Sequence, residues 1–111
     1  MIKVLILDYG MGNIFSVQKK IKSLGITQII SNSREEILDA DKTILPGVGH
    51  FSKAMENLKK LNVIQSLNEK VLEKKTPVLG ICLGMQLMAL SSEEGKSNGL
   101  GWFDATAVSY T

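Results

Sequence analysis

Short apolar, strand-like runs that alternate with helical patterns constrain the fold of this chain most. The runs cover residues 2–7, 27–31, 42–45 and 78–81, and a loop and a helical pattern follow each of them. The first run is apolar on both faces, which is typical of a parallel strand buried between helices. Alternating strands and helices imply βαβ units with right-handed crossovers. The sequence therefore predicts an α/β fold with a doubly wound, flavodoxin-like parallel sheet flanked by helices.

Capping residues and apolar residues at helical spacing predict the helices between these strands. Asn13 and Ser33 stand where side chains that cap helix N-termini are expected, and Gly25 stands where a helix would stop. Residues 91–101 are polar and rich in glycine, which favours a loop, and a further strand is expected within residues 102–110. The predicted helices cover residues 14–24, 34–38, 52–61, 63–74 and 82–90.

Length and composition exclude several classes of protein. With 44% apolar and 22% charged residues, the chain has the composition of one globular domain, residues 1–111. The net charge of +2 does not favour a surface that binds polyanions. A single cysteine excludes an internal disulfide, and no Cys/His cluster indicates a metal site. Neither a membrane span nor a signal peptide is evident, so we expect a soluble, cytoplasmic domain.

The loop at residues 8–13 does not have the spacing of a nucleotide-binding loop. Its two glycines begin a G-x-G-x-x-G pattern, but Phe15 stands where the third glycine would be. No phosphate-binding G-x-x-x-x-G-K-[ST] motif is present, and the paired lysines are typical of solvated helix faces. We therefore expect no nucleotide cofactor and no nucleic-acid partner.

Residues 80–84 read G-I-C-L-G between a buried strand and an apolar helical pattern. This is the cysteine form of the nucleophile elbow, a sharp turn that presents the nucleophile above the sheet. The flanking glycines avoid clashes at the turn, and the helix N-terminus would favour the thiolate of Cys82. The backbone N–H of Leu83 would point toward an oxyanion formed on a carbonyl attacked by Cys82. The sequence thus predicts a nucleophilic cysteine, although a lone cysteine is more often an inert core residue.

Two further glycine-bearing loops are expected beside this elbow. The carboxyl ends of parallel strands meet at one edge of the sheet, where sites in such folds gather. The loop at residues 8–13 follows the first strand, and Pro46-Gly47-Val48-Gly49 follows the third. The second loop is either an ordinary tight turn or the source of a second oxyanion donor. His50 is the only histidine and could act as a base for Cys82, but a loop or surface role is the simpler interpretation.

The three loops together resemble a known family. D-Y-G-M-G-N at residues 8–13, L-P-G-V-G-H-F at 45–51 and G-I-C-L-G-M-Q at 80–86 are similar to motifs of the triad-type, class I glutamine amidotransferases. The resemblance covers the whole chain in order. It is closest to the glutaminase subunits of imidazole glycerol phosphate synthase, which function in histidine biosynthesis. The elbow alone indicates only the superfamily, whereas the first two loops are more specific.

The resemblance implies a hydrolase that works within a heterodimeric lyase. Such a subunit hydrolyses glutamine to glutamate and ammonia, and the ammonia passes to a (β/α)₈-barrel cyclase partner that makes imidazole glycerol phosphate. No cofactor or metal is implied. By position, Cys82 would form the glutamyl thioester, and Leu83 with Gly47-Val48 would make the oxyanion hole, the latter after a peptide rearrangement. The remaining implied residues are Gln86 and Glu94 for holding glutamine, and Asn13 and Gly49 for the cyclase interface.

This sequence departs from the family pattern in one respect. The family's catalytic histidine and glutamate come from a segment well beyond the elbow, whereas no histidine follows Cys82 here. The chain therefore resembles the amino-terminal part of the domain, with a sheet that lacks its later strands and exposes an unpaired edge. We expect the chain alone to hydrolyse glutamine very slowly or not at all.

Three alternatives remain open. The chain could be a truncated, non-catalytic module that binds a partner. It could be a glutaminase that serves another acceptor, such as a surface-sugar pathway. It could also belong to the cysteine-elbow proteases and stress proteins, but those usually place His or Ala after the nucleophile, where this chain has Leu83.

Overall fold

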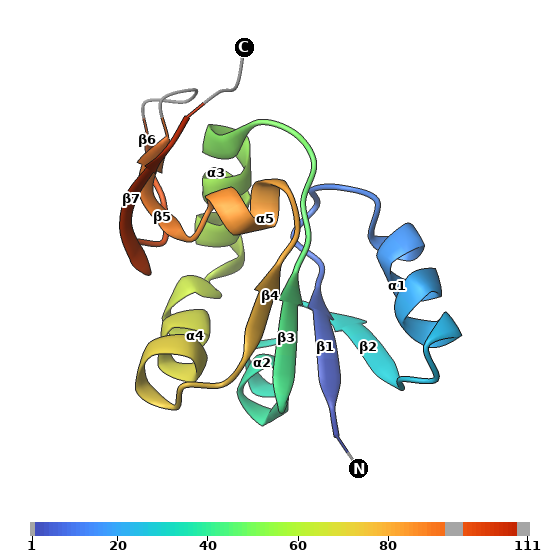
Figure 1. The fold of residues 1–111 in the computed structure, drawn as a ribbon. Coiled ribbons are helices and arrows are strands. Elements are labelled where there is room, and N and C mark those ends of the chain that lie inside the picture. The colour runs from blue at the N-terminus through green and yellow to red at the C-terminus, as the bar shows by residue number, and fades with distance from the viewer. Residues whose placement is uncertain (1, 93–96, 109–111) are drawn as a thin grey trace.

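A parallel four-stranded sheet forms the centre of the molecule (Figure 1). The structure is a computed structural model, and it describes residues 2–92 and 97–108. The strand order is β2-β1-β3-β4. This arrangement confirms the predicted α/β fold and all four predicted strands. The strands are β1 (Val4–Leu7), β2 (Gln28–Ser31), β3 (Lys42–Leu45) and β4 (Val78–Gly80).

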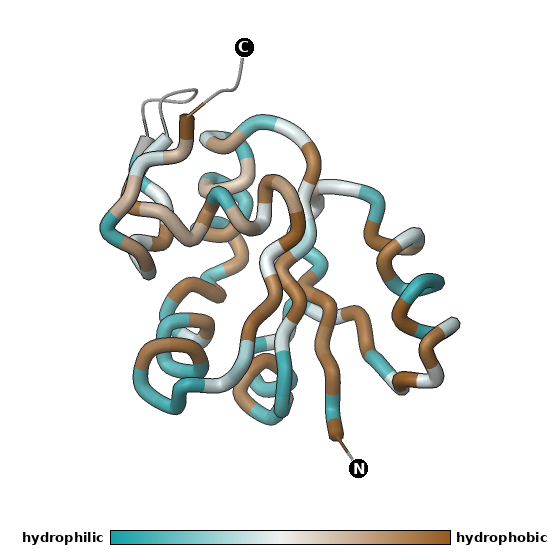
Figure 2. Tube along the Cα trace, viewed as in Figure 1, coloured by the Kyte–Doolittle hydropathy of each residue, from teal (hydrophilic) through white to brown (hydrophobic). Residues whose placement is uncertain are grey.

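Strand β1 lies inside the sheet because all four of its residues are buried. It pairs in parallel with β2 on one side and β3 on the other, so that Ile6 is opposite both Ile30 and Ile44. Figure 2 shows β1 as a predominantly apolar segment. A strand of this composition needs cover on both faces, and helices supply it.

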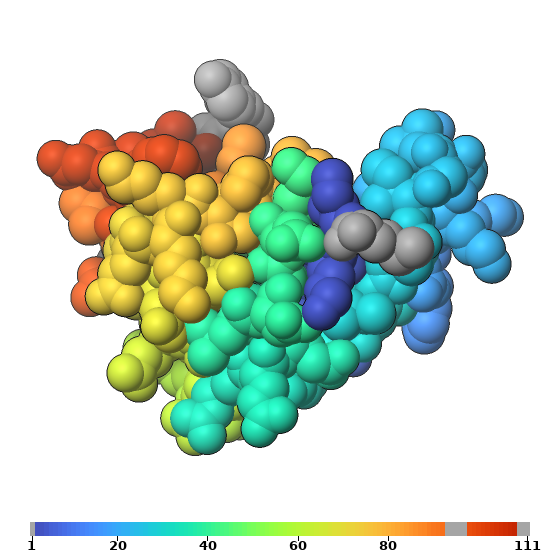
Figure 3. Space-filling view, turned by 90° about the horizontal axis from the view of Figure 1, so that it is seen from below, coloured from blue at the N-terminus to red at the C-terminus, as the bar shows by residue number. Residues whose placement is uncertain are grey.

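The helices pack on both faces of the sheet, with α1 on one and α2, α3 and α4 on the other (Figure 1). Figure 3 views the molecule from the amino ends of the strands, with α4 (yellow) and α1 (light blue) on opposite sides of β1 and β3. The helices are α1 (Ile14–Ser23), α2 (Arg34–Asp39), α3 (Phe51–Leu61), α4 (Ile64–Asn68) and α5 (Leu83–Gln86), and a π-helical segment, η1 (Glu69–Glu73), continues α4.

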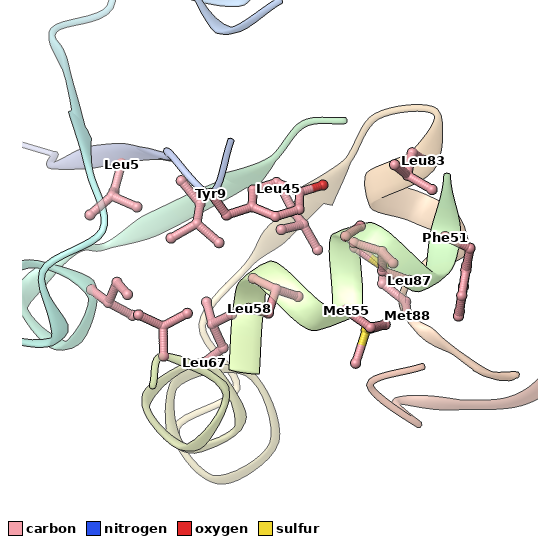
Figure 4. Close-up of a cluster of buried hydrophobic side chains, with 14 of the residues drawn as sticks. Leu5, Tyr9, Leu45, Phe51, Met55, Leu58, Leu67, Leu83, Leu87 and Met88 are labelled. Atoms are coloured by element: carbon pink, nitrogen blue, oxygen red, sulfur yellow. The ribbon is translucent and has the colours of Figure 1, made fainter. Parts of the chain in front are cut away.

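Alternate residues of the strands enter two separate apolar clusters. The larger cluster lies between the sheet and α2–α4, and it includes Leu5, Leu45 and Leu58, all fully buried (Figure 4). The smaller cluster, built on Val4, Ile6 and Ile44, packs against partly buried residues of α1. Both clusters follow from the period-2 alternation of side chains along a strand.

The predicted helix caps are present. The side chain of Asn13 accepts a hydrogen bond from the N–H of Ser16 at 3.3 Å, and Ser33 accepts one from the N–H of Glu36 at 3.4 Å. Each bond satisfies one of the N–H groups that a helix N-terminus leaves without an intrahelical partner.

The chain after the elbow departs from the prediction. The helix expected over residues 82–90 ends at Gln86, and a second sheet of order β6-β5-β7 follows. Its strands are β5 (Ala89–Ser92), β6 (Ser97–Asn98) and β7 (Phe103–Ala107). The predicted strand within residues 102–110 is therefore confirmed over 103–107. The prediction of a helix to residue 90, and of a loop over the whole of 91–101, was wrong.

Pairing with the later segment explains why the helix stops. The N–H of Leu100 donates to the carbonyl of Leu87 at 2.7 Å, and that of Trp102 donates to the carbonyl of Met88 at 2.8 Å. These carbonyls are thereby used by strand-like partners instead of a continuing helix. The indole N–H of Trp102 also donates to Asn68 at 2.7 Å, which ties this region to α4.

The central sheet ends at β4 within the described residues. β4 pairs with β3 alone in that part of the chain, and Leu79 is 55% exposed. The expected unpaired edge is thus present at the strand that leads into the elbow.

Candidate functional site

Three loops meet at the carboxyl ends of the strands, as the sequence predicts (Figure 1). They are the 8–13 loop after β1, the 46–50 loop after β3 and the elbow at residues 81–82 after β4. The first two are in close contact, because a Cβ on Gly12 would lie 2.9 Å from the backbone nitrogen of Val48. The 46–50 loop in turn contacts the start of α5.

Cys82 has the strained backbone of a nucleophile elbow. Its φ is 52° and its ψ is −117°, and the residue is exposed. A non-glycine residue in such a sparsely populated region costs about 1–3 kcal/mol and persists only where its surroundings enforce it. The geometry therefore places an accessible thiol above the carboxyl edge of the sheet.

The two glycines of the elbow are required by close packing. A Cβ on Gly84 would overlap the carbonyl oxygen of Leu45 and lie 2.6 Å from its carbon, and a Cβ on Gly80 would lie 2.7 Å from Cα of Met85. Backbone atoms of neighbouring elements cannot yield to such contacts. The reason for the G-x-C-x-G spacing that the sequence suggested is thus visible in the packing.

The expected oxyanion donor is already occupied. The N–H of Leu83 donates to the carbonyl oxygen of Gly47 at 3.1 Å. Gly47 is buried and Val48 is 66% exposed. The structure therefore brings together the three residues expected to form the oxyanion hole, but the 46–50 loop presents a carbonyl to Leu83 where a second donor was expected. We call this the closed arrangement of the loop.

The helix after Cys82 contributes less to the site than the sequence suggested. α5 spans only four residues. The N–H of Gly84 donates to Ile81, and those of Met85 and Gln86 donate to the carbonyl of Cys82. These first-turn N–H groups are thus used within the turn. The predicted stabilisation of a thiolate by a helix N-terminus consequently has little support in this geometry.

Tyr9 is a residue of the site that sequence reasoning missed. Its side chain is 2% exposed, and its hydroxyl donates to the carbonyl of Pro46. Burial raises the pKa of the Tyr9 hydroxyl above its ordinary value of 10.0, so the group is a neutral donor at neutral pH. Asn57 donates to the backbone carbonyl of Tyr9 at 3.0 Å, and Figure 4 shows Tyr9 beside Leu45. The only signal in the sequence was an aromatic residue two positions after a buried strand.

The remaining predicted residues lie around this centre. Gln86 is half-buried on α5, one helical turn beyond Cys82, and Glu94 falls outside the described residues. Asn13 and Gly49 are both exposed, at the rim formed by the first two loops.

His50 caps α3, where its Nδ1 accepts a hydrogen bond from the N–H of Ser52 at 3.2 Å. A capping role thus accounts for His50 without any part in the chemistry of Cys82.

The described residues offer no group of three or more His, Cys, Asp or Glu side chains that could hold a metal ion. Among the helices of residues 2–92 and 97–108, none has the length and apolar character needed to cross a bilayer.

Comparison with known proteins agrees with the site. The family model described as "Glutamine amidotransferase class-I" matches residues 5–99. A relative from Methanococcus maripaludis, named imidazole glycerol phosphate synthase subunit HisH 2, is 51% identical over 96% of this chain and 53% of its own length. A protein of the same name from Pseudomonas aeruginosa is 46% identical over the same shares. A relative from Prochlorococcus marinus, named imidazole glycerol phosphate synthase subunit HisH, is 48% identical over 91% of this chain and 47% of its own length.

A solved structure, described as a glutamine amidotransferase, shares the fold with a TM-score of 0.78 at 20% identity. The match covers 95% of this chain and 55% of that one. The chain thus spans about half the length of the curated relatives it matches. With the family model covering most of its residues, the chain belongs to the class-I glutamine amidotransferase family.

Proposed function

We propose that this chain is the amino-terminal part of the glutaminase subunit of imidazole glycerol phosphate synthase. The strained, exposed Cys82 beside Leu83 and the 46–50 loop is the observation that carries the proposal. The names of the relatives support the choice of acceptor pathway, since they are 43–51% identical over most of this chain. From this proposed function we also infer a cytoplasmic location, because amino-acid biosynthesis takes place there.

The proposed reaction begins with attack by Sγ of Cys82 on the side-chain amide carbon of glutamine. A carbon–sulfur bond forms, and the carbonyl oxygen becomes an oxyanion in a tetrahedral intermediate. The carbon–nitrogen bond then breaks, and the nitrogen leaves as ammonia after gaining a proton. Water hydrolyses the resulting thioester to glutamate and restores the thiol. Gln86 and Glu94 are proposed to hold the amino-acid end of glutamine.

The oxyanion hole requires a rearrangement of the 46–50 loop. In the closed arrangement the carbonyl of Gly47 occupies the N–H of Leu83. Rotation of the Gly47–Val48 peptide would withdraw that carbonyl and turn the N–H of Val48 toward the same position. Two N–H donors would then face the oxyanion, and the loss of one such donor typically costs about 100- to 1,000-fold in rate. Gly47 lowers the cost of this rotation, because the ψ angle that must change belongs to a residue without a side chain.

The base for the reaction is proposed to come from outside this chain segment. His50 caps α3, and Cys82 is followed by no histidine. The resemblance to the family implies that a histidine and a glutamate from the later part of the domain complete the triad. We therefore expect the 111-residue chain alone to show no appreciable turnover of glutamine.

The partner is proposed to be a (β/α)₈-barrel cyclase that receives the ammonia. Asn13 is exposed in the neighbouring 8–13 loop and Gly49 is exposed within the loop that must rearrange, so a partner bound there would be in a position to drive the rotation. The proposed place of the interface thus links partner binding to formation of the oxyanion hole.

The experiment that tests the proposal uses the full-length protein with its cyclase. Cys82→Ala should abolish glutamine-dependent formation of imidazole glycerol phosphate, while formation from added ammonium salt should continue. A matched control is Ser23→Ala, an exposed residue at the end of α1 that precedes the amino end of β2 and should leave both reactions unchanged. Glutamine-dependent product formation by Cys82→Ala would contradict the assigned nucleophile. A wild-type complex that forms no imidazole glycerol phosphate from either glutamine or ammonium salt would contradict the assigned pathway.

One observation also favours a second candidate, a non-catalytic module that binds a partner. The closed arrangement of the 46–50 loop, together with the satisfied N–H groups of α5, describes a site that is not ready for catalysis. A glutamine-like electrophile separates the two candidates. A glutaminase should be labelled at Cys82 when the cyclase is bound, whereas a pure binding module should remain unlabelled under all conditions.

A further inference from the structure

Tyr9 connects the 8–13 loop to the peptide that precedes the oxyanion position. Its hydroxyl donates to the carbonyl of Pro46, across a separation of 37 residues in the sequence. The bond is buried, and a buried hydrogen bond holds its two groups more firmly than one that competes with water. The Pro46–Gly47 peptide is therefore held in one orientation.

The same hydroxyl also fills the space behind Gly47. A Cβ built on Gly47 would collide with the Tyr9 hydroxyl, and it would lie 3.1 Å from Cβ of Leu83 on the other side. Gly47 is thus confined between Tyr9 and the start of α5. The 8–13 loop adds a second contact, since a Cβ on Gly12 would lie 3.0 Å from Cα of Gly47.

Two hydrogen bonds on adjacent peptides define the closed arrangement. Tyr9 holds the carbonyl of Pro46, and the N–H of Leu83 holds the carbonyl of Gly47. The two peptides share Cα of Gly47, so fixing the first restricts the dihedral angles through which the second can turn. Loss of the first bond should therefore weaken the second.

We propose that Tyr9 is a positioning residue that holds the 46–50 loop closed over the N–H of Leu83, by hydrogen bonding Pro46 and packing behind Gly47. The inference rests on the proposed function, because closure matters for catalysis only if Leu83 serves as an oxyanion donor. Through this contact the 8–13 loop, which carries the exposed Asn13, is coupled to the state of the oxyanion hole.

The first experiment compares hydrogen exchange of two amides in the full-length protein. Tyr9→Phe removes the hydroxyl and keeps the ring. We expect the amide of Leu83 to exchange about fivefold faster, the effect of losing one ordinary hydrogen bond. The amide of Ile81 is the internal reference, since it donates to Leu45 at 3.0 Å in the same elbow but not to the loop. Its exchange should not change.

Thr43→Val is the matched control for loss of a buried hydroxyl. Thr43 is the second residue of β3, three residues before the loop, and within the described residues its hydroxyl has no hydrogen-bond partner. This variant should leave the ratio of Leu83 to Ile81 exchange unchanged. An unchanged ratio in Tyr9→Phe would overturn the proposal. So would an equal rise at both amides, which would mean that Tyr9 only stabilises the fold.

A second pair of variants tests the packing behind Gly47 independently. Gly47→Ala should lower the melting temperature of the wild type more than that of Tyr9→Phe, because only the wild type has the hydroxyl that the new methyl group meets. If Gly47→Ala lowered the melting temperature equally in the wild type and in Tyr9→Phe, the proposed contact would be overturned. Neither measurement needs glutamine or the cyclase, so a failure of the proposed function would be seen separately, in the Cys82→Ala assay.

Discussion

The two faces of the central sheet differ sharply, although the same strands supply both. The face covered by α2–α4 contains a large cluster of fully buried side chains, among them Leu5, Leu58 and Leu67. On the other face, α1 has no buried residue, and its Phe15 is 70% exposed. Buried apolar area is the main source of folding free energy, so the stability of the molecule is concentrated on the first face.

The elbow and its loops are built on the stable face. Leu83, Leu87 and Tyr9 all belong to the larger cluster, whereas Asn13 begins the helix of the thinner face. The proposed nucleophile is therefore held by the best-packed part of the molecule. Of the two proposed interface residues, Asn13 lies on the less buried side, and Gly49 is an exposed part of the 46–50 loop on the stable face.

The largest effect is expected where the elbow meets the stable face. Gly84→Ala places a methyl group against the backbone of Leu45 and Pro46, which cannot yield. We expect a loss of about 3–5 kcal/mol in the free energy of unfolding, measured by urea titration of the full-length protein. Gly25→Ala is the control, since its Cβ meets nothing within 4 Å and only the positive φ of 78° opposes it. It should cost about 1–2 kcal/mol.

If Gly84→Ala were no more costly than Gly25→Ala, the close approach of α5 to β3 would be contradicted. The comparison separates steric overlap from backbone strain, because both glycines exchange a hydrogen for a methyl group and only one has a backbone neighbour in the way.

The contrast between the faces is tested directly by shortening one aliphatic side chain on each. Leu58→Ala removes a fully buried side chain of α3 and should cost about 3 kcal/mol. Ile21→Ala removes a half-buried side chain of α1 and should cost about 1 kcal/mol, since part of its surface already contacts water. Urea titration of both variants measures the two losses. Equal losses would show that α1 is covered more fully in solution than in this structure.

How far the sequence predicted this molecule depends on the range of the interactions. The strands, the caps at Asn13 and Ser33, and the turn at Cys82 are encoded by neighbouring residues, so local patterns indicate them. The early end of α5 was missed because β5 is set by pairing with β7, a segment farther along the chain. A run of apolar residues fits a helix or a strand equally well until its partner is known.

The site was predicted to a similar extent. The loops at residues 8–13 and 46–50 were expected beside Cys82 because all three follow parallel strands. The contact between Tyr9 and Pro46 could not be predicted, since it depends on how two loops from different strands pack. The closed arrangement was missed for the same reason, because the residue types at positions 47 and 48 do not indicate how the peptide between them is oriented.

A smaller effect is expected from the helix caps, and it should not differ between the faces. Asn13→Ala and Ser33→Ala each remove one side-chain hydrogen bond to a helix N-terminus, on α1 and α2 respectively. Capping is a local interaction, so each should cost about 1 kcal/mol in the free energy of unfolding. Thermal unfolding of the two variants checks the equality. A much larger loss on α2 would mean that cap strength depends on the packing of the helix.

The smallest effect is expected from the exposed ion pair between Lys3 and Asp39. Their charged groups form a salt bridge, and the hydrogen bond from Lys3 followed by its charge lowers the pKa of Asp39 below its ordinary value of 3.8. The folded state binds the proton of the Asp39 carboxyl less tightly than the unfolded state does. The pair therefore stabilises the fold at pH values above the ordinary pKa of 3.8. The stabilisation is lost as the pH falls through the lower, folded pKa.

Asp39→Asn removes this pH dependence while keeping the size of the side chain. The melting temperature of the wild type should exceed that of the variant slightly at neutral pH, and the difference should vanish in acid below the folded pKa of Asp39. Added salt at neutral pH should shrink the same difference, because both groups are exposed to solvent. A difference that persists in acid would mean that Asp39 acts through its position at the end of α2 and not through its charge.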